Sequence, residues 1–277
     1  MFDSIEALAL AWEQAGGHGD RQARIERNAH WIPYYSFLAT GREEMDVAID
    51  PHAAEITQLL FDRGLVRADV DVLDIGSGTG AFSHAFAARG LHVNALEMDA
   101  ASLSVNHSQA ETLGLHNIRY ENSMWETYQA DRKFSFVFSS MCPAICNFTE
   151  LERMESYASE ACGIIAVTRG SYDLHRKQLI QRLDVRPQGG MTTEVLWYIE
   201  ALYLSGRQAD VTNFSRKFEY SMPLTDAIAR NERYFEIFGI PAEQSRPILT
   251  AYFHSVAENG LVRDETQLHT ALITWRV

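Results

Sequence analysis

A glycine-rich turn between an apolar run and a helical pattern places the strongest constraint on how this chain can fold. The mainly apolar run 70–75 is typical of a buried parallel strand, and Gly76, Gly78 and Gly80 then lead into a helical pattern that begins near Ala81. Glycine permits positive φ angles and lets a ligand approach the main chain without meeting a Cβ, while the start of a helix offers unpaired N–H groups. The turn therefore predicts a strand–turn–helix unit that binds a ligand.

Strands and helices alternate along the rest of the chain. After the strand at 70–75, further strands are expected at 91–97, 117–121, 134–138, 163–168, 211–220 and 272–277, with helical patterns between most of them. Such alternation favours a mostly parallel sheet with helices on both faces and right-handed crossovers. We therefore expect an α/β fold.

Asp74 distinguishes two classes of ligand for the turn. The spacing Gly76-x-Gly78-x-x-Ala81 also fits a dinucleotide fingerprint, which would make the chain an NAD(P)-dependent oxidoreductase. A carboxylate two residues before the first glycine is unfavourable beside a pyrophosphate but attracts an ammonium or sulfonium group. Asp74, Gly76, Gly78 and Gly80 together match the first motif of the class I S-adenosylmethionine-dependent methyltransferases, and the chain resembles that family over about residues 52–168.

The resemblance implies a Rossmann-like, seven-stranded, mostly parallel sheet whose last strand is antiparallel. It also implies S-adenosylmethionine as cofactor, S-adenosylhomocysteine as product, and methyl transfer to oxygen, nitrogen or sulfur of a small molecule. Glu97, at the end of the second strand, corresponds to the acid that binds the cofactor's ribose, and Met98 follows it. The remaining residues that we expect near the cofactor are Ser77, Ser123, Met124, Trp125 and Ser139. The family's usual acid after the third strand is missing, because Asn122-Ser123-Met124-Trp125 stands there.

The acceptor side of the site is predicted less directly. We expect Tyr34 and Tyr35 in an aromatic lid segment, Met141 and Cys142 after the fourth strand, and Arg169 after the fifth to line an acceptor pocket. A general base matters only for a protonated acceptor, and His30 and His175 are the candidates. Cys142 and Cys146 are four residues apart, so on a helix they would lie on the same face and could together bind a soft metal. We expect both instead to be buried packing residues, and we predict no metal site.

Two segments flank or interrupt the core pattern. Residues 1–50 are expected to form an N-terminal helical flap, and residues 51–277 the methyltransferase domain, with helical insertions at about 171–205 and 223–259 on the substrate side. A non-catalytic cofactor-binding regulator with this domain is a third possibility besides the methyltransferase and the oxidoreductase.

Charge and composition exclude several classes of partner. The net charge of −13 repels nucleic acid and anionic membrane, and no stretch of about 18 apolar residues is present. Three cysteines in 277 residues suit a reducing compartment. We therefore expect a cytoplasmic monomer or homodimer that acts on a small molecule.

Overall fold

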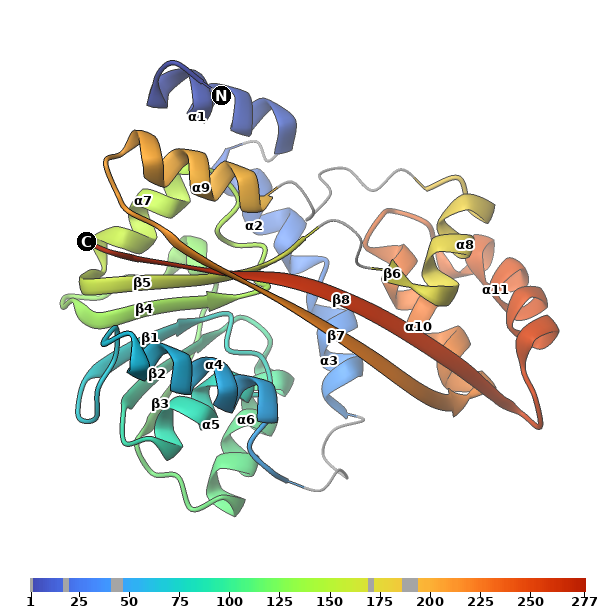
Figure 1. Cartoon of the computed structure of the whole chain (residues 1–277). Helices are drawn as coiled ribbons and strands as arrows, with labels where there is room; N and C mark the ends of the chain where they lie inside the picture. Colours follow the sequence, from blue (N-terminus) through green and yellow to red (C-terminus); the bar gives the residue numbers. More distant parts are fainter. Residues whose placement is uncertain (1, 17–19, 41–46, 169–171, 186–193) are drawn as a thin grey trace.

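One twisted sheet runs through the centre of the molecule (Figure 1). The structure is a computed structural model that describes residues 2–16, 20–40, 47–168, 172–185 and 194–277. The sheet has the order β3-β2-β1-β4-β5-β8-β6, and β7 also pairs with β8. The strands are β1 Asp71–Ile75, β2 His92–Glu97, β3 Ile118–Asn122, β4 Phe134–Ser140, β5 Ala158–Val167, β6 Tyr172–Asp173, β7 Asp210–Pro223 and β8 Leu261–Arg276.

The strand directions confirm the predicted fold class. Strands β1 to β5 pair in parallel, whereas β8 lies antiparallel between β5 and β7. Two details differ from the sequence prediction. The last strand begins at Leu261 and not at 272, and the two-residue strand β6 is added against it.

Helices cover both faces of this sheet. The helices are α1 Ile5–Gly16, α2 Arg21–Ala29, α3 Ile32–Thr40, α4 Pro51–Asp62, α5 Ala81–Ala88, α6 Ala100–Thr112, α7 Phe148–Ser156, α8 Leu174–Arg182, α9 Glu194–Leu204, α10 Leu224–Glu236 and α11 Ala242–Val256, with a short 3₁₀ turn η1 at Trp125–Thr127. Leu73 packs with Trp12 and Tyr198 on the face covered by α1, α7 and α9, whereas Val72 packs with Ile56 and Phe86 on the opposite face. Successive residues of a strand point to opposite faces, which explains this division.

A third apolar cluster lies beyond the sheet, where β7 and β8 continue as a long two-stranded ribbon (Figure 1). Leu179 of α8, Phe235 of α10 and Phe253 of α11 are buried together there, and we call α8, α10 and α11 the cap. The insertion expected at 171–205 is therefore divided, because α8 joins the cap while α9 packs against the sheet beside α1.

In the described part of the chain, no helix combines the length and the apolar character that crossing a bilayer requires.

Candidate functional site

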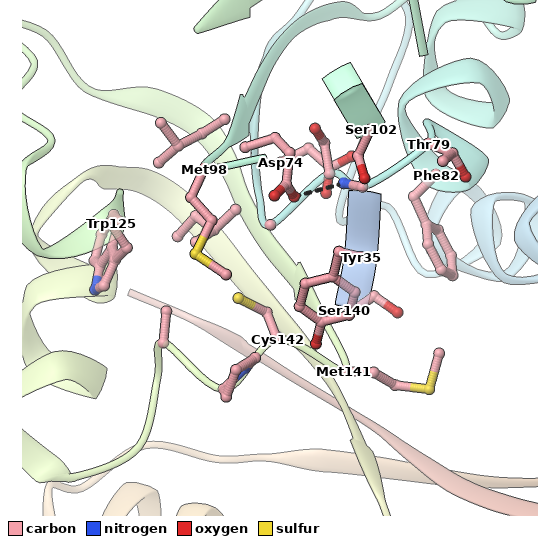
Figure 2. Close-up of a pocket in the computed structure, with 18 of the residues that line it drawn as sticks. Tyr35, Asp74, Thr79, Phe82, Met98, Ser102, Trp125, Ser140, Met141 and Cys142 are labelled. Atoms are coloured by element: carbon pink, nitrogen blue, oxygen red, sulfur yellow. Dashed lines mark hydrogen bonds between the residues drawn. The ribbon is translucent and has the colours of Figure 1, made fainter. Parts of the chain in front are cut away.

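A cavity of about 370 Å³ opens at the carboxyl ends of β1, β2 and β4. This edge of an open α/β sheet is where such folds bind ligands. Figure 2 shows the cavity from Trp125 at one side to Thr79 and Phe82 at the other, with Tyr35 of α3 pointing into it. The predicted residues that line it are Tyr35, Asp74, Gly76, Ser77, Gly78, Glu97, Met98, Ser123, Trp125, Met141 and Cys142.

The glycine turn forms one wall of this cavity, and two of its glycines are required by their surroundings. Gly76 has φ +71°, and a Cβ there would lie 2.5 Å from the Cys142 Sγ atom. Gly80 has φ +96° at the N-cap of α5, and a Cβ there would lie 2.4 Å from Nε2 of His84. Side chains rarely adopt such φ values, and no room exists for one at either position. Gly80 does not line the cavity, so its contribution is to the shape of the turn.

Asp74 places a nearly desolvated carboxyl group at the cavity. Its side chain is 1% exposed, and Oδ2 accepts a hydrogen bond of 2.6 Å from the Ser83 hydroxyl. Burial raises the pKa of Asp74 to about 7, although the bond from Ser83 opposes this shift and the nearby Glu97 adds to it. A cationic ligand beside Asp74 would favour the ionised carboxylate and lower this pKa again.

Glu97, at the end of β2, bridges the turn and the next helix. Its Oε2 atom accepts from the Gly78 amide at 2.9 Å, and its Oε1 atom accepts from the Asp99 amide at 2.9 Å. The pKa of Glu97 is raised, mainly because its carboxyl group is buried. Each carboxylate oxygen has a second lone pair, so hydroxyl groups of a sugar can still bind there.

Trp125 and Met98 border the opposite side of the cavity (Figure 2). The indole N–H of Trp125 donates to Glu150 Oε2 at 2.7 Å, and the Arg153 guanidinium lies 4.1 Å from the ring centre. These contacts fix the ring from outside the cavity. An aromatic ring held near a polarisable thioether suits a flat heteroaromatic ligand.

Tyr35 and Cys142 face the middle of the cavity (Figure 2). Burial raises the pKa of Tyr35 above its ordinary value and raises the pKa of Cys142 to about 12. Both groups therefore stay protonated at neutral pH. Cys146 is buried outside the cavity lining with a pKa raised to about 12, so the two cysteines are unfavourable ligands for a soft metal.

Several predicted residues lie elsewhere. Met124 and Ser139 do not line the cavity, and Tyr34 is buried with its hydroxyl accepting from Arg176 Nη2 at 3.0 Å. His30 is exposed at the end of α2 and does not line the cavity. Arg169 lies outside the described residues.

His175 belongs to the cap and not to the cavity lining. One ring nitrogen lies 2.9 Å from the Tyr252 hydroxyl, and the other lies 2.8 Å from the Arg263 carbonyl oxygen. Because both ring nitrogens have hydrogen-bond partners away from the cavity, His175 has a structural role.

Sequence reasoning missed thirteen of the residues that line the cavity. They are Asn28, Leu38, Ala39, Ile75, Thr79, Ala81, Phe82, Leu96, Ser102, Glu126, Ser140, Pro143 and Ala144. Thr79, Ser140 and Pro143 adjoin motif residues, so sequence proximity was an available signal for them. The residues of α2 and α3 had no such signal, because their position depends on how the N-terminal helices fold over the sheet.

Comparisons with known proteins agree with this geometry. Residues 72–162 match a family described as a methyltransferase domain. No curated protein matches the chain. The fold is similar to magnesium protoporphyrin IX methyltransferase from Synechocystis PCC 6803 with bound S-adenosylhomocysteine, with TM-score 0.54, 12% identity, and coverage of 93% of this chain and 100% of that one. It is also similar to a methyltransferase from Geobacter sulfurreducens in complex with S-adenosylhomocysteine, with TM-score 0.51, 14% identity, and coverage of 87% and 98%.

The fold and the matched segment define the class of protein. The chain has the class I methyltransferase fold, and residues 72–162 match the methyltransferase-domain family within it. The predicted S-adenosylmethionine-dependent methyltransferase is therefore confirmed as the enzyme class. The comparisons give no support to the nicotinamide-dependent oxidoreductase.

Proposed function

We propose that this enzyme transfers the methyl group of S-adenosylmethionine to an oxygen, nitrogen or sulfur atom of a small molecule bound next to the cofactor. The observation that carries the proposal is one cavity that joins the acid-and-glycine turn to Tyr35, Met141 and Cys142. A cavity of about 370 Å³ suits metabolite-sized ligands. The net charge of −13 also disfavours a nucleic-acid acceptor.

Each wall of the cavity has a distinct part in this proposal. Asp74 and the amides of the glycine turn would hold the charged amino-acid part of the cofactor, and Glu97 would bind its ribose. Met98 and Trp125 would border its base. When bound, the cofactor supplies a sulfonium-activated methyl group, which is already a strong electrophile.

The protein's remaining task is to position the acceptor and exclude water. Tyr35 and Cys142 face the cavity in neutral form, so they can direct a nucleophile by hydrogen bonds but cannot take a proton from it near pH 7. Neither His30 nor His175 lines the cavity. An acceptor that needs no proton removed by Tyr35 or Cys142, such as an unprotonated amine or a thiolate, suits these two residues best.

Calorimetric titration tests the cofactor part of the proposal, and labelled methyl transfer tests the acceptor part. S-adenosylhomocysteine should bind with a micromolar or lower Kd, and NAD should not bind. Incubation with labelled S-adenosylmethionine and a protein-free extract of small metabolites should then yield labelled product. Binding without turnover in any extract would support a cofactor-binding regulator. Transfer of label to purified protein or nucleic acid, with none to the metabolites, would contradict a small-molecule acceptor.

A further inference from the structure

The charged residues that line the cavity are all acids. Asp74, Glu97 and Glu126 contribute carboxyl groups, and no lysine, arginine or histidine lines the cavity in the part of the chain that the structure describes. Charges in such partly buried surroundings are screened less than charges on an open surface. The cavity should therefore have a negative electrostatic potential.

Two side chains in the middle of the cavity respond to this potential. Burial is the largest cause of the raised pKa of Tyr35, and the nearby Cys142 and Glu97 add to it. Burial also raises the pKa of Cys142 to about 12, and the negative charges of Glu97 and Glu126 contribute to this shift. The potential thus acts where Tyr35 and Cys142 face the cavity (Figure 2). It would repel an anion placed there and attract a cation.

The wall that the proposed cofactor contacts leave over is aromatic and apolar. Tyr35 and Leu38 of α3, Phe82 of α5 and Met141 after β4 line it. Trp31 stacks on the ring of Tyr35 with ring centres 5.6 Å apart, which holds that ring in place. Aromatic rings attract cations and a thioether is polarisable, so this wall suits a methylated ammonium group as well as the uncharged amine from which it forms.

We propose that the acceptor is an amine whose nitrogen is uncharged before methylation and positively charged after it. The nitrogen lone pair forms a bond to the methyl carbon, and the carbon–sulfur bond breaks with its electron pair going to sulfur. The positive charge thereby passes to the nitrogen, where the acids and the aromatic wall stabilise it. Any proton on the nitrogen can leave to water afterwards. The inference rests on the proposed function and narrows it to nitrogen, because a thiolate or an oxyanion would be repelled before reaction.

The same potential limits how basic the amine can be. A negative potential favours the protonated amine, which has no free lone pair. Tyr35 and Cys142 cannot take that proton near neutral pH, because they remain protonated themselves. A weakly basic nitrogen, such as one on or in an aromatic ring, is already uncharged in neutral water. Its ring also matches the aromatic wall.

Three small probes of similar size and different charge test the sign of this potential without any methyl transfer. They are N-methylpyridinium, which is a cation, toluene, which has the same shape without charge, and benzoate, which is an anion. Each is titrated by calorimetry or NMR into the wild-type protein saturated with S-adenosylhomocysteine. N-methylpyridinium should bind at least about tenfold more tightly than benzoate. Toluene gives the affinity that shape and apolar contact alone provide.

The substitution Glu126→Gln tests whether the acids cause this preference. Glutamine has nearly the same shape and can still accept the 2.7 Å hydrogen bond from Asn28 Nδ2. Because one carboxylate is lost from the lining, the cation-to-anion affinity ratio should fall about fivefold, while the affinity for toluene stays the same. Glu26→Gln is the matched control, since it removes the same charge from an exposed side chain of α2 and should leave the ratio unchanged.

Transfer of an isotope-labelled methyl group to the metabolites of a protein-free extract identifies the accepting atom. Carbon NMR distinguishes methyl groups on nitrogen, oxygen and sulfur, and we expect the label on nitrogen. The inference is overturned if the label is on oxygen or sulfur, if benzoate binds as tightly as N-methylpyridinium, or if Glu126→Gln leaves their affinity ratio unchanged. If no label is transferred, the proposed function fails, whereas the probe titrations still decide the charge preference of the cavity.

Discussion

At the scale of single residues, the protonation of Asp74 should govern cofactor affinity. Its pKa is raised by burial from 3.8 to about 7, and a cationic ligand favours the ionised form. Binding of S-adenosylmethionine should therefore release a proton below pH 7, and its Kd should rise about fivefold between pH 7 and pH 6. Calorimetry in two buffers of different ionisation enthalpy measures both the affinity and the proton release.

The same raised pKa predicts the opposite effect on the stability of the apo protein. The folded chain holds the Asp74 proton more tightly than the unfolded chain, so this group should lower the free energy of unfolding as pH rises from about 4 to about 7. Asp74→Asn is the control for both effects. It should weaken binding of S-adenosylmethionine and make the Kd nearly independent of pH. A wild-type affinity that does not change between pH 8 and pH 6 would contradict the assignment.

At the scale of elements, α3 is joined to the cap by a cluster of Tyr34, Tyr234 and Arg176. Arg176 Nη2 donates to the Tyr34 hydroxyl at 3.0 Å, and its guanidinium lies 3.8 Å from the Tyr234 ring centre. Tyr34→Phe should lower the free energy of unfolding by about 1–3 kcal/mol, because it removes an acceptor from a largely buried guanidinium. Urea denaturation measures this loss.

Hydrogen exchange gives an independent readout for Tyr34→Phe. Amides of α3 should exchange faster in the variant, because the helix loses a contact with the cap. Tyr203→Phe is the matched control, since that side chain is 71% exposed and its loss of a hydroxyl should leave stability nearly unchanged. Equal stability of the two variants would mean that the cluster does not join α3 to the cap.

At the scale of the whole molecule, β8 connects the cap to the sheet. It runs from Leu261 to Arg276, and Trp275 is buried near its end with the indole N–H donating to Glu155 Oε2 at 2.8 Å. Trp275→Ala should cost about 3–5 kcal/mol of stability, because it leaves a large cavity in the core. Because the sheet and the cap share β8, they should unfold together. The circular-dichroism signal and S-adenosylhomocysteine binding of the variant should therefore be lost in one transition, at a lower urea concentration than in the wild type.

Trp275→Phe separates packing from the hydrogen bond. It keeps most of the apolar volume, so it should cost less than Trp275→Ala. A loss below about 1 kcal/mol for the alanine variant would contradict the central place of β8 in the core.

The sequence alone was sufficient for features that depend on neighbouring residues. The glycine turn needs φ values and space that only glycine provides, and the alternation of short apolar runs with helical patterns limits the chain to an α/β sheet. Asp74 and Glu97 follow from their spacing along β1 and β2, because parallel strands bring their carboxyl ends to one edge.

Only the tertiary structure decided features that depend on what covers a segment. The first half of β8 is polar and lies in a half-exposed ribbon, so it had no apolar run to mark it as a strand. The aromatic residues of α3 showed no helical period, because the helix packs both over the cavity and against the cap. Asn28 looked like any polar residue of a surface helix until the fold placed it against Glu126 at the cavity. Local chemistry thus specifies the glycine turn, whereas the groups that complete the pocket depend on contacts between distant parts of the chain.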